Sequence, residues 1–191
     1  MTVDNHTEYA DDARIIDRIN SGDTGAFRLL YDRYHQKIYR TVYRMLNSAD
    51  DAADVTQDIF VRAFERLNSL KDGQAFQAWL MQLAVNMVRD KLRRFIWPTF
   101  SLTTTDDDTE IDMPDNLPGP QQIAENNDLS QHVQQALMKL SPDHRTVIIL
   151  HHLEGMSLEE IAVILKTPTG TLKSRLARAR VQLRDLLKDL I

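Results

Sequence analysis

A cationic and polar set of side chains follows a short, well-capped helix near the C-terminal end of the chain. Ser157, with Glu160 three positions later, has the pattern of a capping box that starts a helix. Lys166-Thr167-Pro168 ends that helix, and Thr169-Gly170-Thr171 leads into a long helix to about Leu187. Two helices joined by a turn of three to four residues are typical of a helix-turn-helix, whose second helix enters the major groove of DNA.

The second of these helices divides into two faces. At about 100° per residue, four apolar residues fall on one side and are expected to pack inward: Leu172, Leu176, Ala179 and Leu183. Small, polar or cationic residues lie opposite or on the flank: Lys173, Ser174, Ala177 and Arg178. Lys and Arg pair with guanine edges or phosphates, and Ser can do either. The positive charge alone would fit a solvated basic helix equally well. The capping box, the turn between the helices and the division of the second helix into two faces together favour DNA binding.

Two other groups of residues could bind a metal. His151-His152 lies near Glu154, but adjacent residues on a helix diverge by about 100° and do not easily share one ion. Asp106-Asp107-Asp108 lies in a stretch without periodicity, and a metal-dependent helical enzyme would need carboxylates on facing helices. The chain has no cysteine, no His-Glu-x-x-His, no glycine-rich phosphate loop and no nucleophile elbow. The sequence therefore predicts no catalytic activity, no cofactor and no metal.

The elements that position these residues are predicted to be helices throughout. Apolar residues recur at helical spacing from about Ala13 to Phe95, with no convincing period-2 stretch. Asp23 is expected to cap a helix that ends at Asn47-Ser48, and Asp50 or Asp51 to open a second. A third starts near Gln74 and has this inward stripe: Phe76, Trp79, Leu80, Leu83, Ala84, Met87, Val88 and Leu92. Three to four packed helices make one small domain.

Charge and composition divide the chain into three parts. Residues 13–97, with a net charge of +4, form the first helical domain. Residues 98–130 hold eight acids and no base, are rich in Pro and Thr, and are predicted to be a flexible acidic linker. Helical periodicity resumes in residues 131–191, the second domain, whose last part from Lys166 carries +5. The overall charge of −5 hides this segregation. The fold class is therefore all-α, two small helical domains on a tether.

Nothing in the sequence suggests a membrane segment or a secretory signal. The first twelve residues carry four acids and no Lys or Arg, the reverse of a signal peptide. The longest purely aliphatic run, Val147–Leu150, is far too short to span a bilayer. We expect a cytoplasmic protein without membrane insertion.

Both domains resemble sigma factors of the extracytoplasmic-function (ECF) class, the subunits that give bacterial RNA polymerase its promoter specificity. SLEEIA at 157–162 with PTGTLKSRLARAR at 168–180 looks like sigma region 4, which binds the −35 element. DVTQDIFVRAF at 54–64 resembles the polymerase-binding helix of region 2. FQAWLMQLAVNMVRDKLRR at 76–94 resembles the helix that reads the −10 element. The matches cover about residues 26–97 and 133–187, in the order of the family.

The resemblance implies contacts residue by residue. Asp54, Gln57 and Asp58 would bind the clamp coiled coil of the polymerase β′ subunit. The loop from Lys71 to Phe76 would hold a base extruded from the melted −10 strand, which needs a stabilising pocket, and Asn86 would bond to it. Phe76 belongs to this set although its spacing, like that of Trp79, follows the buried stripe. A cationic group suits phosphate contacts: Arg89, Lys91, Arg93 and Arg94.

For the −35 element, the implied set lies in and just before the helix-turn-helix: His151, Thr169, Thr171, Lys173, Ser174, Arg175, Ala177 and Arg178. The implied partners are core RNA polymerase, through its β′ clamp and β flap, promoter DNA, and a cognate anti-sigma factor. The alternative is a helix-turn-helix repressor that binds operator DNA as a homodimer without polymerase. A gel shift with the purified protein alone separates the two.

Overall fold

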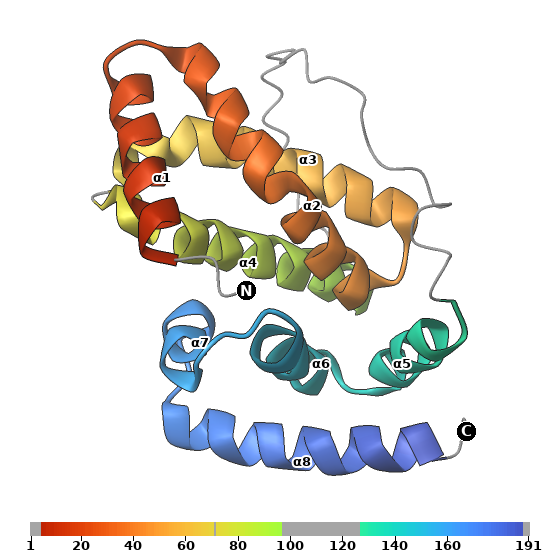
Figure 1. Cartoon of the computed structure of the whole chain (residues 1–191). Coiled ribbons are helices and arrows are strands. Elements are labelled where there is room, and N and C mark those ends of the chain that lie inside the picture. The colour runs from red at the N-terminus through yellow and green to blue at the C-terminus, as the bar shows by residue number, and fades with distance from the viewer. Residues whose placement is uncertain (1–4, 71, 97–126, 189–191) are drawn as a thin grey trace.

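The computed structural model describes residues 5–70, 72–96 and 127–188, and every regular element in those ranges is helical (Figure 1). The first domain consists of α1 (Asn5–Asn20), α2 (Phe27–Leu46), α3 (Ala49–Arg66) and α4 (Phe76–Ile96). The second consists of α5 (Asn127–Lys139), α6 (Pro142–Ile148), a π-helical turn η6 (Ile149–Leu153), α7 (Leu158–Leu165) and α8 (Thr169–Lys188). The predicted all-α, two-domain class is confirmed. α5 begins inside the range predicted as linker, and the rest of that linker, with Asp106-Asp107-Asp108, lies outside the described residues.

The first domain is a bundle in which α2 packs against α1, α3 and α4. α1 is tied to α2 by the buried carboxylate of Asp12, which accepts hydrogen bonds from Arg33 and Tyr34. The break at Asn47-Ser48 forms where the sequence predicts it, but α3 starts at Ala49 and is opened by Ser48, not by Asp50 or Asp51. Asn47 ends α2 in the left-handed region (φ 56°), and Ser48 caps α3 by accepting a hydrogen bond from the Asp51 N–H.

Asp23 does not cap α2, contrary to the sequence prediction. Its side chain makes no capping hydrogen bond, and a short 3-10 turn (Thr24–Ala26) precedes the helix. The carboxylate instead forms an ion pair with Arg18 of α1, with an N–O distance of 2.7 Å. Arg18 lies five residues upstream, at the end of α1, and its guanidinium holds the carboxylate that would otherwise cap α2.

The helix ends of the second domain follow local rules closely. Ser141 accepts from the His144 N–H, with Pro142 at the first helical position of α6. Ser157 and Glu160 form the predicted capping box of α7. Lys166 ends α7 in the left-handed region (φ 50°), and Gly155 supplies the positive φ (71°) of the turn before it. The helix-turn-helix is confirmed as α7 and α8.

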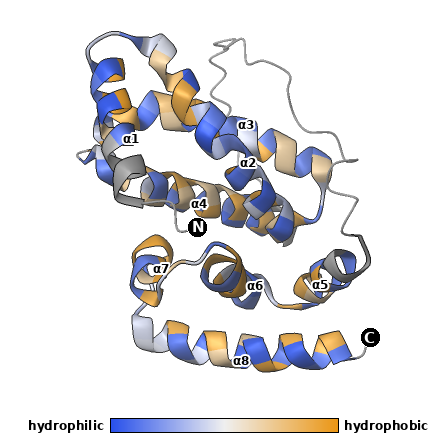
Figure 2. Cartoon of the chain, in the orientation of Figure 1, coloured by the Kyte–Doolittle hydropathy of each residue, from blue (hydrophilic) through white to orange (hydrophobic). Residues whose placement is uncertain are grey.

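The helices are amphipathic, and the two domains lie against each other. Hydrophobic and hydrophilic residues alternate along each helix in Figure 2. In Figure 1, α5, α6 and α7 form a middle layer between the first domain above and α8 below. The buried apolar side chains of both domains, apart from Ala136, belong to one continuous cluster. α4 packs on α7 as well as on α2 and α3. Its buried face is accordingly wider than predicted, since Met81 and Val85 are also buried.

The buried His35 makes the stability of the first domain sensitive to acid. Only 6% of this residue is exposed, and its ring stacks on Tyr31 with centroids 4.8 Å apart. Burial lowers the pKa of the imidazole, against a smaller opposing effect of Asp32. The neutral ring therefore contributes stability that is fully present above the unfolded pKa of about 6.5 and is lost as pH falls through the folded pKa.

We expect His35→Gln, which cannot titrate, to reduce the difference in melting temperature between pH 7.5 and pH 5.5. Thermal unfolding followed by circular dichroism measures it. The control is the half-buried His144 of the second domain, since His144→Gln should leave that difference as in the parent protein. Parallel pH profiles for the parent and His35→Gln would contradict the assignment.

Candidate DNA and polymerase interfaces

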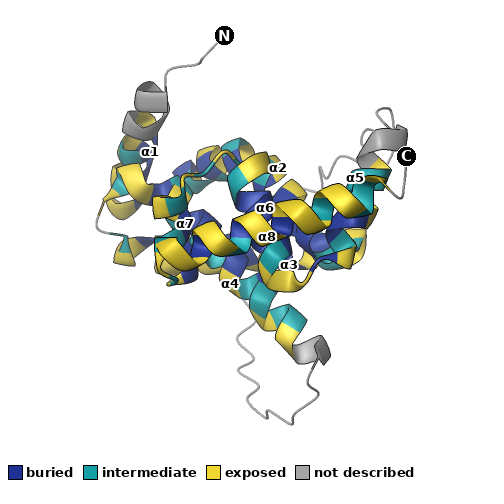
Figure 3. Cartoon of the chain, turned by 90° about the horizontal axis from the view of Figure 1, so that it is seen from below, coloured by how far each residue is buried: buried dark blue, intermediate teal, exposed yellow. Residues whose placement is uncertain are grey.

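The outer face of α8 carries most of the predicted −35 residues. Leu172, Leu176 and Ala179 are buried as predicted, and Leu183 is half-buried. The opposite side faces away from the rest of the molecule and is mostly exposed in Figure 3. It carries five of the predicted contacts: Thr171, Lys173, Ser174, Ala177 and Arg178. Within the described residues, neither Lys173 nor Arg178 has a carboxylate at ion-pair distance, so both cations are available to phosphates or bases.

Four other predicted or neighbouring side chains are held by contacts inside the domain. Arg175 forms an ion pair with Asp143 of α6 (3.2 Å) and is only 23% exposed, so its guanidinium is anchored at the base of the outer face. Nδ1 of His151 lies 2.8 Å from the Met156 carbonyl. Arg180 donates to Nε2 of His152 at 2.8 Å, and burial, then Arg180 and His151, lower the pKa of His152. His152 accepts through Nε2 in this contact, and it orients Arg180. Thr169, also predicted, is half-buried.

The outward face of α3 presents the predicted polymerase-binding residues. Asp54, Gln57 and Asp58 are exposed, whereas Val55 and Ile59 on the opposite side are buried. Asp54 and Asp58 also line a groove of about 450 Å³ between α3 and α4. The lining is mixed, because Arg62, Asp90 and Lys91 also belong to it, so only the exposed acids of α3 itself favour a cationic partner.

α4 separates the predicted −10 cations into two groups. Asn86, Arg89 and Arg93 follow one another at three- and four-residue spacing and share one helix face, on which Asn86 and Arg93 are exposed. Lys91 lies on another face, where its Nζ is 2.6 Å from Oδ1 of Asp51. This hydrogen bond, together with one from Ser48, lowers the pKa of Asp51. The cations therefore do not form one cluster. Lys71 and the side chain of Arg94 lie outside the described residues.

Phe76 is a core residue, which corrects its inclusion among the −10 contacts. Its side chain is fully buried, with ring centroids 5.5 Å from Tyr34 and 5.9 Å from Trp79. The apolar spacing of α4 already indicated that Phe76 faces inward, and the packing of the helix buries it. Trp79 is half-buried on the same side.

The loop before α4 is anchored to α1. The Asp72 carboxylate accepts from the Gln74 N–H at 2.9 Å, and a 3-10 turn (Gly73–Ala75) leads into the helix. A Cβ at Gly73 would lie 2.6 Å from Cα of Ala13, so only glycine permits this approach. α1 thus fixes the position of the loop that the sequence assigned to the −10 base.

Two residues relevant to these faces were missed by the sequence reading. Gln82 lies on the same face of α4 as Asn86, Arg89 and Arg93, and its spacing alone could have revealed this. Asp143 anchors Arg175, but the two residues are distant in sequence, so only the packing of α6 on α8 brings them together.

The described residues also bear on metal binding and on membrane insertion. Within the described residues, no three His, Asp or Glu side chains are grouped so that they could hold a metal ion. The His151 and His152 rings instead contact Met156 and Arg180. None of the described helices combines the length and apolarity needed to cross a bilayer.

Comparison with known proteins agrees with both halves of the chain. Residues 30–95 match the family model for sigma-70 region 2, and residues 130–183 match that for sigma-70 region 4. The chain is 35% identical to the ECF RNA polymerase sigma factor SigW of Bacillus subtilis, over 92% of this chain and 96% of the relative. It is 32% identical to the ECF sigma-E factor of Escherichia coli K12, over 97% and 98% respectively.

Solved structures give the same result for the fold. CnrH in complex with the cytosolic domain of CnrY superposes with a TM-score of 0.68 at 26% identity, covering 93% of this chain and 97% of that one. The sigma factor RpoE in complex with the anti-sigma factor NepR from Bartonella quintana gives 0.64 at 26% identity, covering 85% and 96%. With two region matches in order and relatives aligned over nearly their full length, the chain belongs to the ECF family of RNA polymerase sigma factors.

Proposed function

We propose that this sigma factor uses three separate exposed faces: α3 for the polymerase clamp, one face of α4 for the −10 element, and the outer face of α8 for the −35 element. The observation that carries the proposal is the face of α8. Lys173 and Arg178 are exposed there beside small residues, on a helix held by a buried stripe. A groove-reading helix needs this combination of reach, charge and lack of bulk.

The first test asks whether the protein acts with polymerase. In a gel shift on promoter DNA, we expect a specific complex with protein plus core polymerase and little specific binding by the protein alone. Specific, equally tight binding without polymerase would favour the repressor alternative instead.

Core binding is proposed to depend on α3. Changing Gln57 and Asp58 together to Ala should weaken core affinity about 5- to 10-fold, or about 1–1.4 kcal/mol, because both are exposed and absent from the buried stripe. Fluorescence anisotropy against core polymerase measures it. Glu65→Ala, exposed at the end of the same helix, is the matched control. Unchanged affinity with a normal circular dichroism spectrum would remove α3 from the interface.

Strand opening is proposed to depend on Asn86. Its exposed amide can bond to an extruded base only after the duplex melts, so Asn86→Ala should lower open-complex formation about 10-fold and closed-complex binding far less. Permanganate footprinting reports the first step and gel shifts at low temperature the second. Equal losses in both would indicate a folding defect.

We also propose the partners and location that fit this role. The protein works in the cytoplasm with core polymerase, contacting the β′ clamp and β flap, and has no catalytic activity of its own. A cognate anti-sigma factor is supported by two structural neighbours, one solved with the anti-sigma factor NepR and one with the cytosolic domain of CnrY. Co-purification from the native host identifies it.

A further inference from the structure

A carboxylate occupies a core position on the inner face of α1. Asp12 continues the buried apolar stripe of this helix, and its side chain is fully buried. The other members of the stripe are Ile15, Ile16 and Ile19. Arg33 and Tyr34 of α2 both donate hydrogen bonds to the carboxylate. Hydrogen bonds are directional, whereas the packing of the isoleucines is not, so these two bonds fix how α1 is placed along and around α2.

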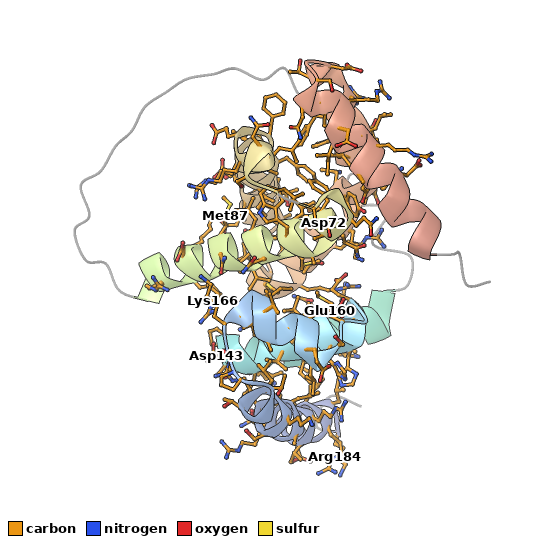
Figure 4. The ribbon with its side chains drawn as sticks, turned by 90° about the vertical axis from the view of Figure 1, so that its left-hand side faces the viewer. Asp72, Met87, Asp143, Glu160, Lys166 and Arg184 are labelled. Atoms are coloured by element: carbon orange, nitrogen blue, oxygen red, sulfur yellow. The ribbon has the colours of Figure 1, made fainter. Side chains whose placement is uncertain are left out.

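A different side of α1 contacts the loop before α4. Figures 1 and 4 show this loop next to α1, and Asp72 is labelled in Figure 4. α1 packs against the 3-10 turn (Gly73–Ala75), and the closest approach is between backbones, because a Cβ on Gly73 would lie 2.6 Å from Cα of Ala13. Ala13 is the residue next to Asp12. Backbone atoms in close contact cannot give way as the end of a flexible side chain can, so a displacement of α1 also displaces this turn.

Tyr34 provides a second connection between the same carboxylate and the start of α4. Its hydroxyl donates to Asp12, and its ring centroid lies 5.5 Å from that of Phe76. Phe76 is the first residue of α4 and directly follows the 3-10 turn. Asp12 is therefore linked to the loop by two routes, through the backbone of α1 to Gly73 and through Tyr34 to Phe76.

We propose that Asp12 is a positioning residue for the −10 interaction and helps to determine which base the loop prefers. Residues 72–75 belong to the loop that would hold the extruded base, and such a pocket loses discrimination when its walls are displaced by about 1 Å. Asp12 contributes no contact to DNA and acts only through the position of the loop. This proposal rests on the proposed use of the first domain to read the −10 element.

The test is the base preference of the holoenzyme at each −10 position, measured by transcription from a library in which this element is randomised. Asp12→Asn keeps the size of the side chain and an acceptor for Tyr34, but removes the charge that pairs with Arg33. The ratio between the favoured base and the others should fall about 5-fold at the position that the loop holds, which corresponds to one weakened base contact. The preference at the −35 element should stay as in the parent protein.

Two further variants reach the same loop by other routes. Tyr34→Phe keeps the ring on Phe76 and deletes the bond to Asp12. Gly73→Ala places a methyl group against α1. Both should alter the preference at the same −10 position, and Asp12→Asn with Gly73→Ala should change it by less than the product of the two fold-changes, because both act through one loop. Asp17→Asn, the same chemical change at an exposed position of α1, is the matched control and should leave the preference unchanged.

A role of Asp12 in stability alone gives a different result, because loss of folded protein lowers transcription from every promoter in proportion and leaves the ratios between bases as they were. Unchanged ratios in Asp12→Asn, with a shift in Gly73→Ala, would overturn the positioning role and leave the loop as the reader of the −10 base. Unchanged ratios in both variants would remove the loop itself from the −10 interaction, and its assignment to the extruded base would fail as well. If Asp12→Asn does not fold, Tyr34→Phe takes its place in both comparisons.

Discussion

Replacing Arg145 with Met should lower the free energy of unfolding of the second domain by about 3–5 kcal/mol, since hydrogen bonds to a charged group contribute roughly 1.5–3 kcal/mol each and water can restore only some of them. Arg145 is 6% exposed, and no carboxylate within the described residues pairs with it. Its guanidinium instead bonds to four backbone carbonyls: Leu137 and Met138 in α5, Leu140 just after it and, across the domain interface, Met45.

Burial lowers the pKa of Arg145. The planar guanidinium nevertheless has the shape that lets one side chain donate to all of these carbonyls at once. Urea unfolding followed by circular dichroism measures the loss. Arg184→Met, at a 63% exposed side chain on α8, is the control and should change stability by less than about 0.5 kcal/mol. A loss below about 1 kcal/mol for Arg145→Met would show that water replaces the guanidinium at these carbonyls.

Arg178→Ala should relax promoter preference at one position of the −35 element and cost about 1–3 kcal/mol, or roughly 5- to 150-fold, on the preferred sequence. Lys173→Ala should instead weaken all sequences alike and reduce the salt dependence of binding. The different expectations follow from position, because Arg178 lies opposite the buried stripe and Lys173 on its flank.

Holoenzyme binding across a promoter library, repeated at two salt concentrations, separates the two kinds of contact. Arg184→Ala, farther along the same helix, controls for a general loss of positive charge. If neither Arg178→Ala nor Lys173→Ala changed affinity or preference, the recognition face would have to be placed elsewhere on α8.

The helix-turn-helix could be predicted from sequence because local interactions determine its ends. Ser157 and Glu160 bond to each other's backbone within one turn, and Lys166 and Gly155 mark positions of positive φ. The buried stripe of α8 follows from a 3.6-residue period. These are short-range effects, and residue spacing is sufficient to find them.

Features that depend on a partner from a distant helix were not predictable in this way. Asp23 pairs with Arg18 instead of capping α2, and Lys91 pairs with Asp51 instead of joining Arg89 and Arg93. Met81 and Val85 of α4 are buried although they lay outside the predicted stripe. The docking of the domains, with Glu154 buried against α2, depends on contacts across more than a hundred residues of sequence.

The layered arrangement has a consequence for the newly made protein. The first domain is complete once Ile96 has left the ribosome, whereas α7, which covers part of α4, ends only at Leu165. At roughly 5–20 residues per second, translation needs about 4–14 s to supply the difference, and helical domains fold far faster than that. During this interval α4 is without its cover, whereas the exposed acids of α3 are accessible both before and after the second domain docks. The nascent chain therefore presents α4 uncovered before the second domain can pack on it.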